Sequence, residues 1–416
     1  MGEEFLAKPS EIGGLAKIVS EIGNDATEAG KFISRHGPAA DWLSGPIIDQ
    51  LLAPVRIAAE ATQRRMGDIG IKTIETGSEL NKAAWLYHNQ DQHTYEALNQ
   101  HKVNLGHRDV PVPVYADREA DGHAVDYESA AVYSKPEEFK LDVPQANKED
   151  TAALITEVAP VLGNVNEAIK SITRMAGHEV DPLGEALKPI PGNWNEVRRI
   201  GEAYKAAGNG MEACGKNLEA GVSRVDQHWN GKAATSFSEW AQLQIAAMKW
   251  EGPVGRVVSD ALGVVADKIR EAVKTILTKV WEMLEERVDF RSVKGAIKTI
   301  AHKIPGAGTA AEIADIGRKL IEIITTAIDL VKKVEILRDR VKSLLEIVSD
   351  PLGTARDKVK QKLDQTLEPI TSAIDDATKK AAIAKDVSEI AQLDHTLDRP
   401  QQDYEIGSGN QPWENA

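Results

Sequence analysis

The chain has 416 residues, of which 42% are hydrophobic and only 5% aromatic, and its formal net charge is −14. This balance favours helices packed on helices over a sheet-rich fold, and the length allows two or three hydrophobic cores. The acidic charge argues against nucleic acid as a partner, because binding phosphate needs a stripe of Lys and Arg. A single cysteine, Cys214, excludes an internal disulfide.

The first ten residues, MGEEFLAKPS, have neither the basic segment nor the apolar segment of a Sec signal peptide. The most apolar run, Leu320–Val331, is interrupted by Glu322 and Asp329, so no stretch reaches the length that spans a bilayer. We therefore expect a chain that is soluble when it is made. If it leaves the cell, it uses a route other than Sec.

Two helical patterns fill roughly the first hundred residues. Apolar residues at alternating steps of three and four mark one helix over Ile12–Ile33 and a longer one over Ile48–Tyr87, which carries three threonines and three glycines. The breakers between His36 and Pro46 separate them. Residues 1–104 are therefore predicted to form a helical hairpin. Residues 105–149 are acidic, contain four prolines, and are predicted to be a linker without a fold of its own.

Residues 150–290 carry three further helical stripes, and a short additional helical pattern begins at Ala233. The stripes are Leu154–Ile172, Val197–Val225 and, after the break at Gly252-Pro253, Val254–Val280. The second stops at a tryptophan-containing break, after which a new helix begins at Ala233. Cys214 falls on the apolar stripe, so we expect a packed thiol rather than a reactive one.

The C-terminal part holds the most regular stripe, Ile313–Val348, within a helical region predicted over residues 291–393. Such a helix must pack on a partner, and short breaks on both sides favour packing within the chain over packing on another copy. A last helix is predicted from near Pro351 to near Leu393, and the polar tail 394–416 is expected to be disordered. No segment alternates long enough to predict a sheet. The predicted fold is all-α, an elongated helical bundle.

One candidate motif is Trp229-Asn-Gly231, which lies between two helical stripes. Asn and Gly supply a turn, because Gly tolerates the positive φ that a sharp reversal needs. Ala233 and Ala234 allow the second helix to approach the first closely, and Phe237 packs one turn further on. The alternative is an ordinary hairpin turn on which a tryptophan rests. The whole pattern, W-x-G-x-A-A-x-x-F on a hairpin, resembles the WXG (ESAT-like) superfamily.

A second motif is the pair Tyr87 and Asp91, one helical turn apart at the end of the second stripe. The alternative is a tyrosine at the edge of a core and a solvated aspartate. The hairpin that carries them resembles the EspC- and PE-like hairpins of actinobacterial type VII (ESX) secretion systems. In those families a Y-x-x-x-D/E motif after the second helix is required for export, and the resemblance assigns that role to Tyr87 and Asp91.

The region from Pro189 to Pro253 looks like the helical N-terminal domain of CpnT-type and PPE proteins. One chain with a Y-x-x-x-D hairpin before a W-x-G hairpin is similar in layout to the EspB-like secreted substrates, and it implies that the two hairpins pack lengthwise as PE packs on PPE. The chain departs from CpnT-type proteins, which end in a toxin domain. The resemblance implies a bipartite secretion signal of Tyr87, Asp91, Trp229 and Gly231, read by the secretion machinery.

Other chemistry finds little support. His88, Asp91, His93 and His101 do not share the spacing of a metal site, and no metal is predicted. The Gly-rich pieces lack the strand and the Lys-Ser/Thr of a phosphate loop, so no cofactor is predicted. No nucleophile elbow or oxyanion-hole context appears among the Ser, His and Asp residues, and we expect no enzyme.

The predicted function is that of a secreted or envelope-associated, non-enzymatic type VII substrate with a structural, binding or oligomeric role, of the kind associated with virulence. The expected partners are the motor ATPase, a dedicated chaperone, a small WXG-type protein or further copies of the chain. In the predicted export mechanism, Tyr87 and Asp91 supply polar contacts and Trp229 supplies apolar area. Two alternatives stay open. The helices over Val254–Val280 and Ile313–Val348 could rearrange into a membrane-active or channel-forming state, or the chain could carry a separate effector.

Overall fold

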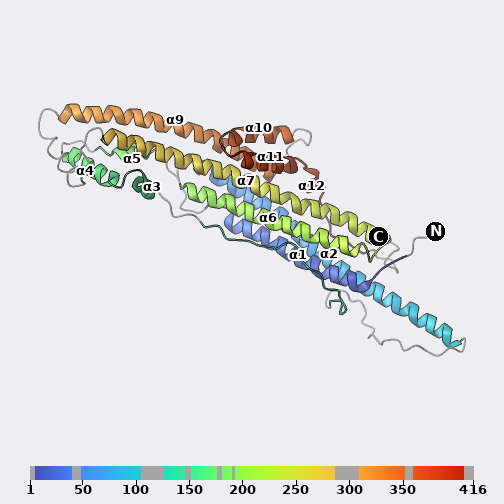
Figure 1. Ribbon diagram of the computed structural model, residues 1–416. Helices are drawn as coiled ribbons and strands as arrows, with labels where there is room; N and C mark the ends of the chain where they lie inside the picture. Colours follow the sequence, from blue (N-terminus) through green and yellow to red (C-terminus); the bar gives the residue numbers. More distant parts are fainter. Residues whose placement is uncertain are drawn as a thin grey trace.

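The computed structural model describes residues 5–39, 48–104, 126–145, 151–175, 180–189, 193–285, 309–351 and 359–406. These ranges form an elongated all-α bundle, as predicted, and within them the only β pairing is an isolated bridge between Ala7 and Trp229. Long helices run side by side along the molecule, and shorter ones gather at one end and along one side (Figure 1). No helix in the described ranges has the length and apolar character needed to cross a bilayer.

The first hairpin consists of α1 (Pro9–His36) and α2 (Asp49–Asn104), whose expected reversal around Ser44-Gly45-Pro46 lies outside the described residues. Glycines bring the two helices close: a Cβ added at Gly23 would lie 2.8 Å from the carbonyl oxygen of Gly70. The backbone of α2 continues well past Tyr87 and Asp91. The prediction that this pair ends a helix is therefore wrong, because the residues that follow include no proline or glycine before residue 105.

The second hairpin consists of α6 (Trp194–Val225) and α7 (Lys232–Glu285). Asn193 caps α6 by accepting hydrogen bonds from two backbone N–H groups. The predicted break at Gly252-Pro253 is absent, and α7 is continuous through it. Close packing explains this, since a Cβ at Gly255 would lie 2.4 Å from the carbonyl oxygen of Tyr204 on α6, and burial of both helices outweighs one lost backbone hydrogen bond. α1 lies along α6.

Three short helices occupy one end of the bundle: α3 (Thr151–Val158), α4 (Leu162–Met175) and α5 (Pro182–Leu187). The single helix predicted over residues 154–172 is thus two helices. Pro160 explains the interruption, because a proline disfavours helical geometry in the residue before it and lacks the N–H that a helix interior needs.

The C-terminal region begins with α9 (Thr309–Ser349), which packs on α7 and α2 of the same chain and buries its apolar stripe there, as predicted. It continues with α10 (Val359–Ser372), α11 (Ala377–Ile390) and α12 (Asp394–Leu397). The one final helix predicted from sequence is therefore several, and Asp376 begins a new one by accepting hydrogen bonds from the N–H groups of Thr378 and Lys379.

Two segments expected to lack structure lie on the bundle instead. Residues 126–145, here called the strap, run in extended form along α1 and α6 (Figure 1). Residues 398–406 fold back so that Tyr404 is 4% exposed, although the tail was predicted to be disordered from residue 394. Aromatic side chains anchor both segments to the bundle. The sequence did not predict this, because most of the residues around those side chains are polar. The rest of the predicted linker and tail, and residues 286–308, lie outside the described residues.

Candidate functional site

The turn between α6 and α7 holds the tryptophan motif. Gly231 has a φ of +94°, and among the described residues no other has a φ in the left-handed region. Thr235 closes the start of α7 by donating from its hydroxyl and its backbone N–H to the carbonyl oxygen of Gly231, at 3.1 and 3.0 Å. The predicted turn and its requirement for glycine are therefore present in the geometry.

Tyr87 and Trp229 come together although 142 residues separate them. The indole Nε1 of Trp229 donates a hydrogen bond to the Tyr87 hydroxyl at 3.2 Å, and the two rings lie edge to face with centroids 6.3 Å apart. Trp229 is 1% exposed and Tyr87 is 3% exposed. The expectation that Trp229 offers apolar area to a partner is therefore wrong for this fold, since the core of the bundle already covers it.

The N-terminal segment crosses the turn as a short extended stretch. Leu6 exchanges hydrogen bonds with Asn230, at 2.8 Å from the Asn230 N–H to the Leu6 carbonyl and 2.7 Å from the Leu6 N–H to the Asn230 side chain. The Lys8 N–H donates to the carbonyl oxygen of His228 at 3.0 Å. Phe5 then lies over the turn, with its ring centroid 6.0 Å from that of Tyr87. This segment was not predicted from the sequence, where its only signal is the apolar pair Phe5-Leu6 after an acidic start.

Tyr404 closes the opposite side of the tryptophan. Its ring meets those of Phe237 and Trp229 edge to face, with centroids 5.5 and 6.5 Å away. Its hydroxyl donates to the carbonyl oxygen of Ala233 at 3.2 Å, and its N–H donates to the hydroxyl of Thr76 at 3.0 Å. Burial raises the pKa of both Tyr404 and Tyr87, although for Tyr87 the hydrogen bond from Trp229 partly opposes the rise. Both phenols therefore stay neutral.

Asp91 lies one turn beyond Tyr87 on α2 and is exposed. Partial desolvation raises the pKa of its carboxyl, and the nearby charge of His88 opposes this. Gly231 is exposed as well, so the four predicted signal residues divide into a buried pair and an accessible pair. Phe5, 52% exposed, adds an apolar group to the accessible surface.

His88, considered above as a metal ligand, belongs to an aromatic cluster with the strap. Its Nδ1 lies 3.1 Å from the hydroxyl of Tyr127, and Trp85 packs edge-on against both rings. The side chain of His101 lies outside the described residues. Across the described part of the chain, no group of three or more His, Cys, Asp and Glu side chains could hold a metal ion.

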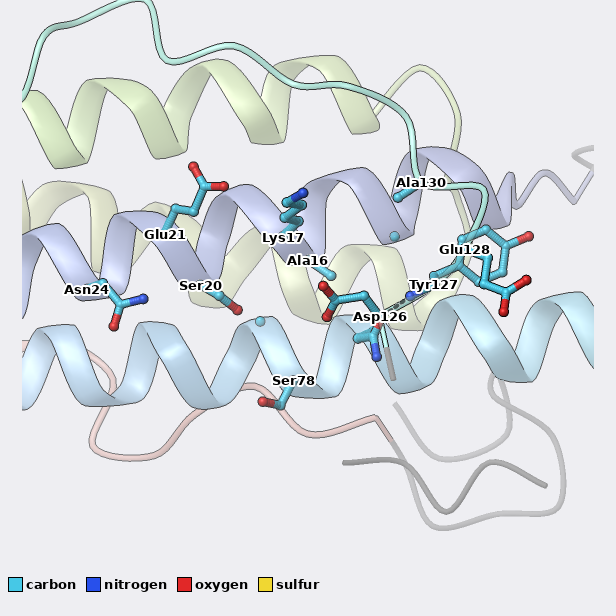
Figure 2. A pocket seen from close by; sticks show the side chains of 13 residues that line it. Ala16, Lys17, Ser20, Glu21, Asn24, Ser78, Asp126, Tyr127, Glu128 and Ala130 are labelled. Carbon is cyan, nitrogen blue, oxygen red and sulfur yellow. Dashed lines mark hydrogen bonds between the residues drawn. The ribbon is translucent and has the colours of Figure 1, made fainter. Parts of the chain in front are cut away.

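A polar groove between α1 and α2 lies beside this cluster, under the first residues of the strap (Figure 2). Gly13, Ala16 and Gly77 form part of its wall. Its other lining residues are mostly polar: Lys17, Ser20, Glu21, Asn24, Ser78, Asn81, Asp126, Tyr127, Glu128 and Ala130. The mixture of charges favours no single ligand.

Comparison of the chain with family profiles, with curated proteins and with solved structures finds no match.

Proposed function

We propose that this chain is a secreted, non-enzymatic substrate of a type VII (ESX) secretion system, exported through a bipartite signal of Tyr87, Asp91, Trp229 and Gly231. One observation supports the proposal most. The Tyr87 hydroxyl and the Trp229 indole, from two motifs 142 residues apart, share a buried hydrogen bond. The contact brings the two motifs to one place in the bundle, as a composite signal requires.

In this proposal the two buried residues have a structural role and the two exposed residues contact the secretion machinery. The buried Tyr87–Trp229 pair fixes the end of the second hairpin against α2, and so sets the position of Asp91 relative to Gly231. The motor ATPase, or a dedicated chaperone, then contacts the accessible groups: the Asp91 carboxylate, the exposed turn at Gly231, and Phe5 above it. Export would therefore require the folded bundle rather than either motif alone.

The finer architecture belongs to the same proposal. The α1–α2 hairpin would pack on the α6–α7 hairpin as PE packs on PPE, with α9–α12 as an addition of this chain. Outside the cytoplasm the protein would act as a structural, binding or oligomeric component. A rod of long helices with an acidic surface suits such a role, since it offers a large area for contact.

Culture fractionation tests the export signal. The wild type, Asp91→Asn and Tyr87→Ala would be produced in an actinobacterium with an active ESX system and in a strain that lacks the motor ATPase. Glu60→Gln is the matched control, because Glu60 is an exposed acid on the same helix, far from the turn. We expect wild type and Glu60→Gln in the culture filtrate, and both signal variants in the cells only.

Circular dichroism on the purified variants separates loss of export from loss of fold. Asp91 is exposed, so Asp91→Asn should keep the helical content of the wild type. Normal amounts of folded Asp91→Asn in the filtrate, or export of the wild type without the motor ATPase, would rule out the proposed signal.

A further inference from the structure

We propose that the groove along α1 and α6 is a binding site for an extended peptide with aromatic residues at every sixth position, and that the strap occupies this site until a segment of a partner protein replaces it. The inference rests on how the bundle holds residues 126–145 and is independent of the export proposal. The strap follows α1 and then α6 for most of its length (Figure 1).

The bundle holds the strap in part through the strap's backbone. On α6, the buried side chain of Asn217 accepts from the N–H of Glu137 at 2.8 Å and donates to the carbonyl oxygen of the same residue at 2.9 Å. The Ala131 N–H donates to the Ser10 carbonyl on α1 at 2.8 Å. An amide that pairs with both backbone groups of one residue recognises an extended chain and not a particular side chain.

Arg224 on α6 adds a contact that joins the strap to both helices. It donates to the carbonyl oxygen of Val132 at 2.7 Å, forms an ion pair with Glu11 of α1, and lies over the ring of Tyr133 at 4.1 Å from its centroid. The Arg224 guanidinium therefore contacts both a backbone carbonyl and an aromatic ring, at neighbouring positions of the bound segment.

Three aromatic rings of the strap pack along the groove, and each ring lies against a glycine of a helix. The rings come from strap positions 127, 133 and 139, which are six residues apart. An added Cβ would lie 2.8 Å from Tyr127 at Gly13, 2.9 Å from Tyr133 at Gly14, and 3.1 Å from Phe139 at Gly210. Figure 2 shows the first of these places, where the strap reaches α1 and α2. Because a Cβ at any of these helix positions would crowd the ring, each glycine leaves the space that an aromatic side chain fills.

Charge adds a fourth feature to the recognised sequence. Lys135 of the strap lies 2.9 Å from Asp25 and 3.8 Å from Glu21, both on α1. The best partner would therefore carry one aromatic residue on each side of a basic one, in the order aromatic, x, basic, with the second aromatic residue four positions after the basic one. A third aromatic residue would come six positions before the first of these.

The strap is weakly attached compared with the helices around it. Most of its side chains are exposed, including Val132 at 89% and Val143 at 52%, and its backbone has none of the repeated hydrogen bonds of a helix. Segments with few buried contacts open locally while the rest of the fold persists. Removing the strap also leaves α1 and α6 packed on each other and on α2 and α7.

A tethered ligand competes strongly with a free one, because the tether gives it an effective concentration on the order of millimolar. The test therefore weakens the strap and leaves the groove intact. Binding of a fluorescent synthetic peptide with the sequence of residues 126–145 would be measured by anisotropy on the full chain and on its variant Tyr133→Ala with Phe139→Ala. We expect at least about tenfold tighter binding to the variant.

Two controls place the peptide in the groove. A peptide with Ala at the positions of Val132 and Val143, whose side chains are exposed, should bind like the original, whereas one with Ala at Tyr133 and Phe139 should not bind. Adding Asn217→Ala to the weakened chain should abolish binding. Binding that survives Asn217→Ala, or no binding to the weakened chain, would overturn the proposal.

Hydrogen exchange on the wild-type chain gives a result that does not depend on any variant's folding. The amides of Ala131 and Glu137 should exchange at least about tenfold faster than those at the centre of α6, because the strap opens without the bundle. Exchange of the strap amides at the same slow rate as the core of α6 would show that the strap leaves only on global unfolding, and would equally overturn the proposal.

Discussion

The guanidinium of Arg65 on α2 binds both carboxylate oxygens of Glu251 on α7, with N–O distances of 2.5 and 2.9 Å. The same guanidinium donates to the carbonyl oxygen of Val348 on α9 at 2.9 Å and lies 5.2 Å from the ring centroid of Trp250. The Arg65 and Glu251 side chains are 6% and 0% exposed. A buried ion pair therefore joins three helices from distant parts of the chain.

Breaking this pair from one side should be costly. Arg65→Met leaves the Glu251 carboxylate buried without its cation, and we expect a loss of about 3–5 kcal/mol in the free energy of unfolding. The double variant Arg65→Met with Glu251→Leu removes both charges and should recover most of that loss. Chemical denaturation monitored by circular dichroism measures both. Equal destabilisation by the single and the double variant would contradict a buried, paired charge.

The hydrogen bond between Tyr87 and Trp229 makes a second prediction. Tyr87→Phe keeps the ring but removes the acceptor of a buried indole N–H, which should cost about 1–3 kcal/mol. Tyr404→Phe is the matched control. It removes a hydroxyl that donates to a carbonyl of the first turn of α7, and should cost about 1 kcal/mol or less. The same denaturation measurement compares them. A Tyr87→Phe variant as stable as wild type would show that the indole finds another partner.

The glycine in the turn, Gly231, leads to a third prediction. Gly231→Ala places a side chain at a φ of +94° and should destabilise the protein by about 1–2 kcal/mol. Gly263→Ala is the control, because an added Cβ there meets nothing within 4 Å inside α7. That change should stabilise the protein by about 0.5–1 kcal/mol through helix propensity. Thermal melting of the two variants should therefore shift in opposite directions, and shifts of the same sign would contradict the turn geometry.

The packing of α9 leads to a fourth prediction. Leu344 is 0% exposed whereas Ile336, on the same helix, is 55% exposed. Leu344→Asp should cost at least about 3 kcal/mol, because it buries an unpaired charge, and Ile336→Asp should change stability by less than about 0.5 kcal/mol. Light scattering before unfolding should give the wild-type mass for both. If Ile336→Asp instead halves the mass, the outer face of α9 is an assembly interface.

The pair of Glu11 and Arg224 makes a prediction about pH. Burial alone would raise the pKa of the Glu11 carboxyl, but the hydrogen bond and charge of Arg224 outweigh it, so the pKa lies below its ordinary value of 4.5. A lowered pKa in the folded state stabilises the protein above that value, and the effect is lost as the pH falls through the folded pKa. The gap in melting temperature between wild type and Glu11→Gln should thus be present at pH 6 and close towards pH 3. A gap that stays constant would contradict the assignment.

The sequence by itself determined the fold class, most helices and the turn at Gly231. These follow from interactions within a few residues: apolar spacing matches the 3.6-residue repeat of a helix, and a glycine suits a reversal between two such stripes. The intramolecular packing of α9 was also predictable, because a stripe that long cannot stay in water. Residues Tyr87, Asp91, Trp229 and Gly231 could be named from spacing and resemblance.

Only the tertiary structure decided which of those residues are accessible and what surrounds them. Three features depend on partners far away in the chain. They are the continuity of α7 through Pro253, the packing of Tyr404 on Trp229, and the hydrogen bonds from Asn217 to the strap. Local patterns carry no information about such partners. A proline or a polar stretch looks like a break when it stands alone, and becomes part of the fold when buried area and hydrogen bonds from distant helices outweigh its local cost.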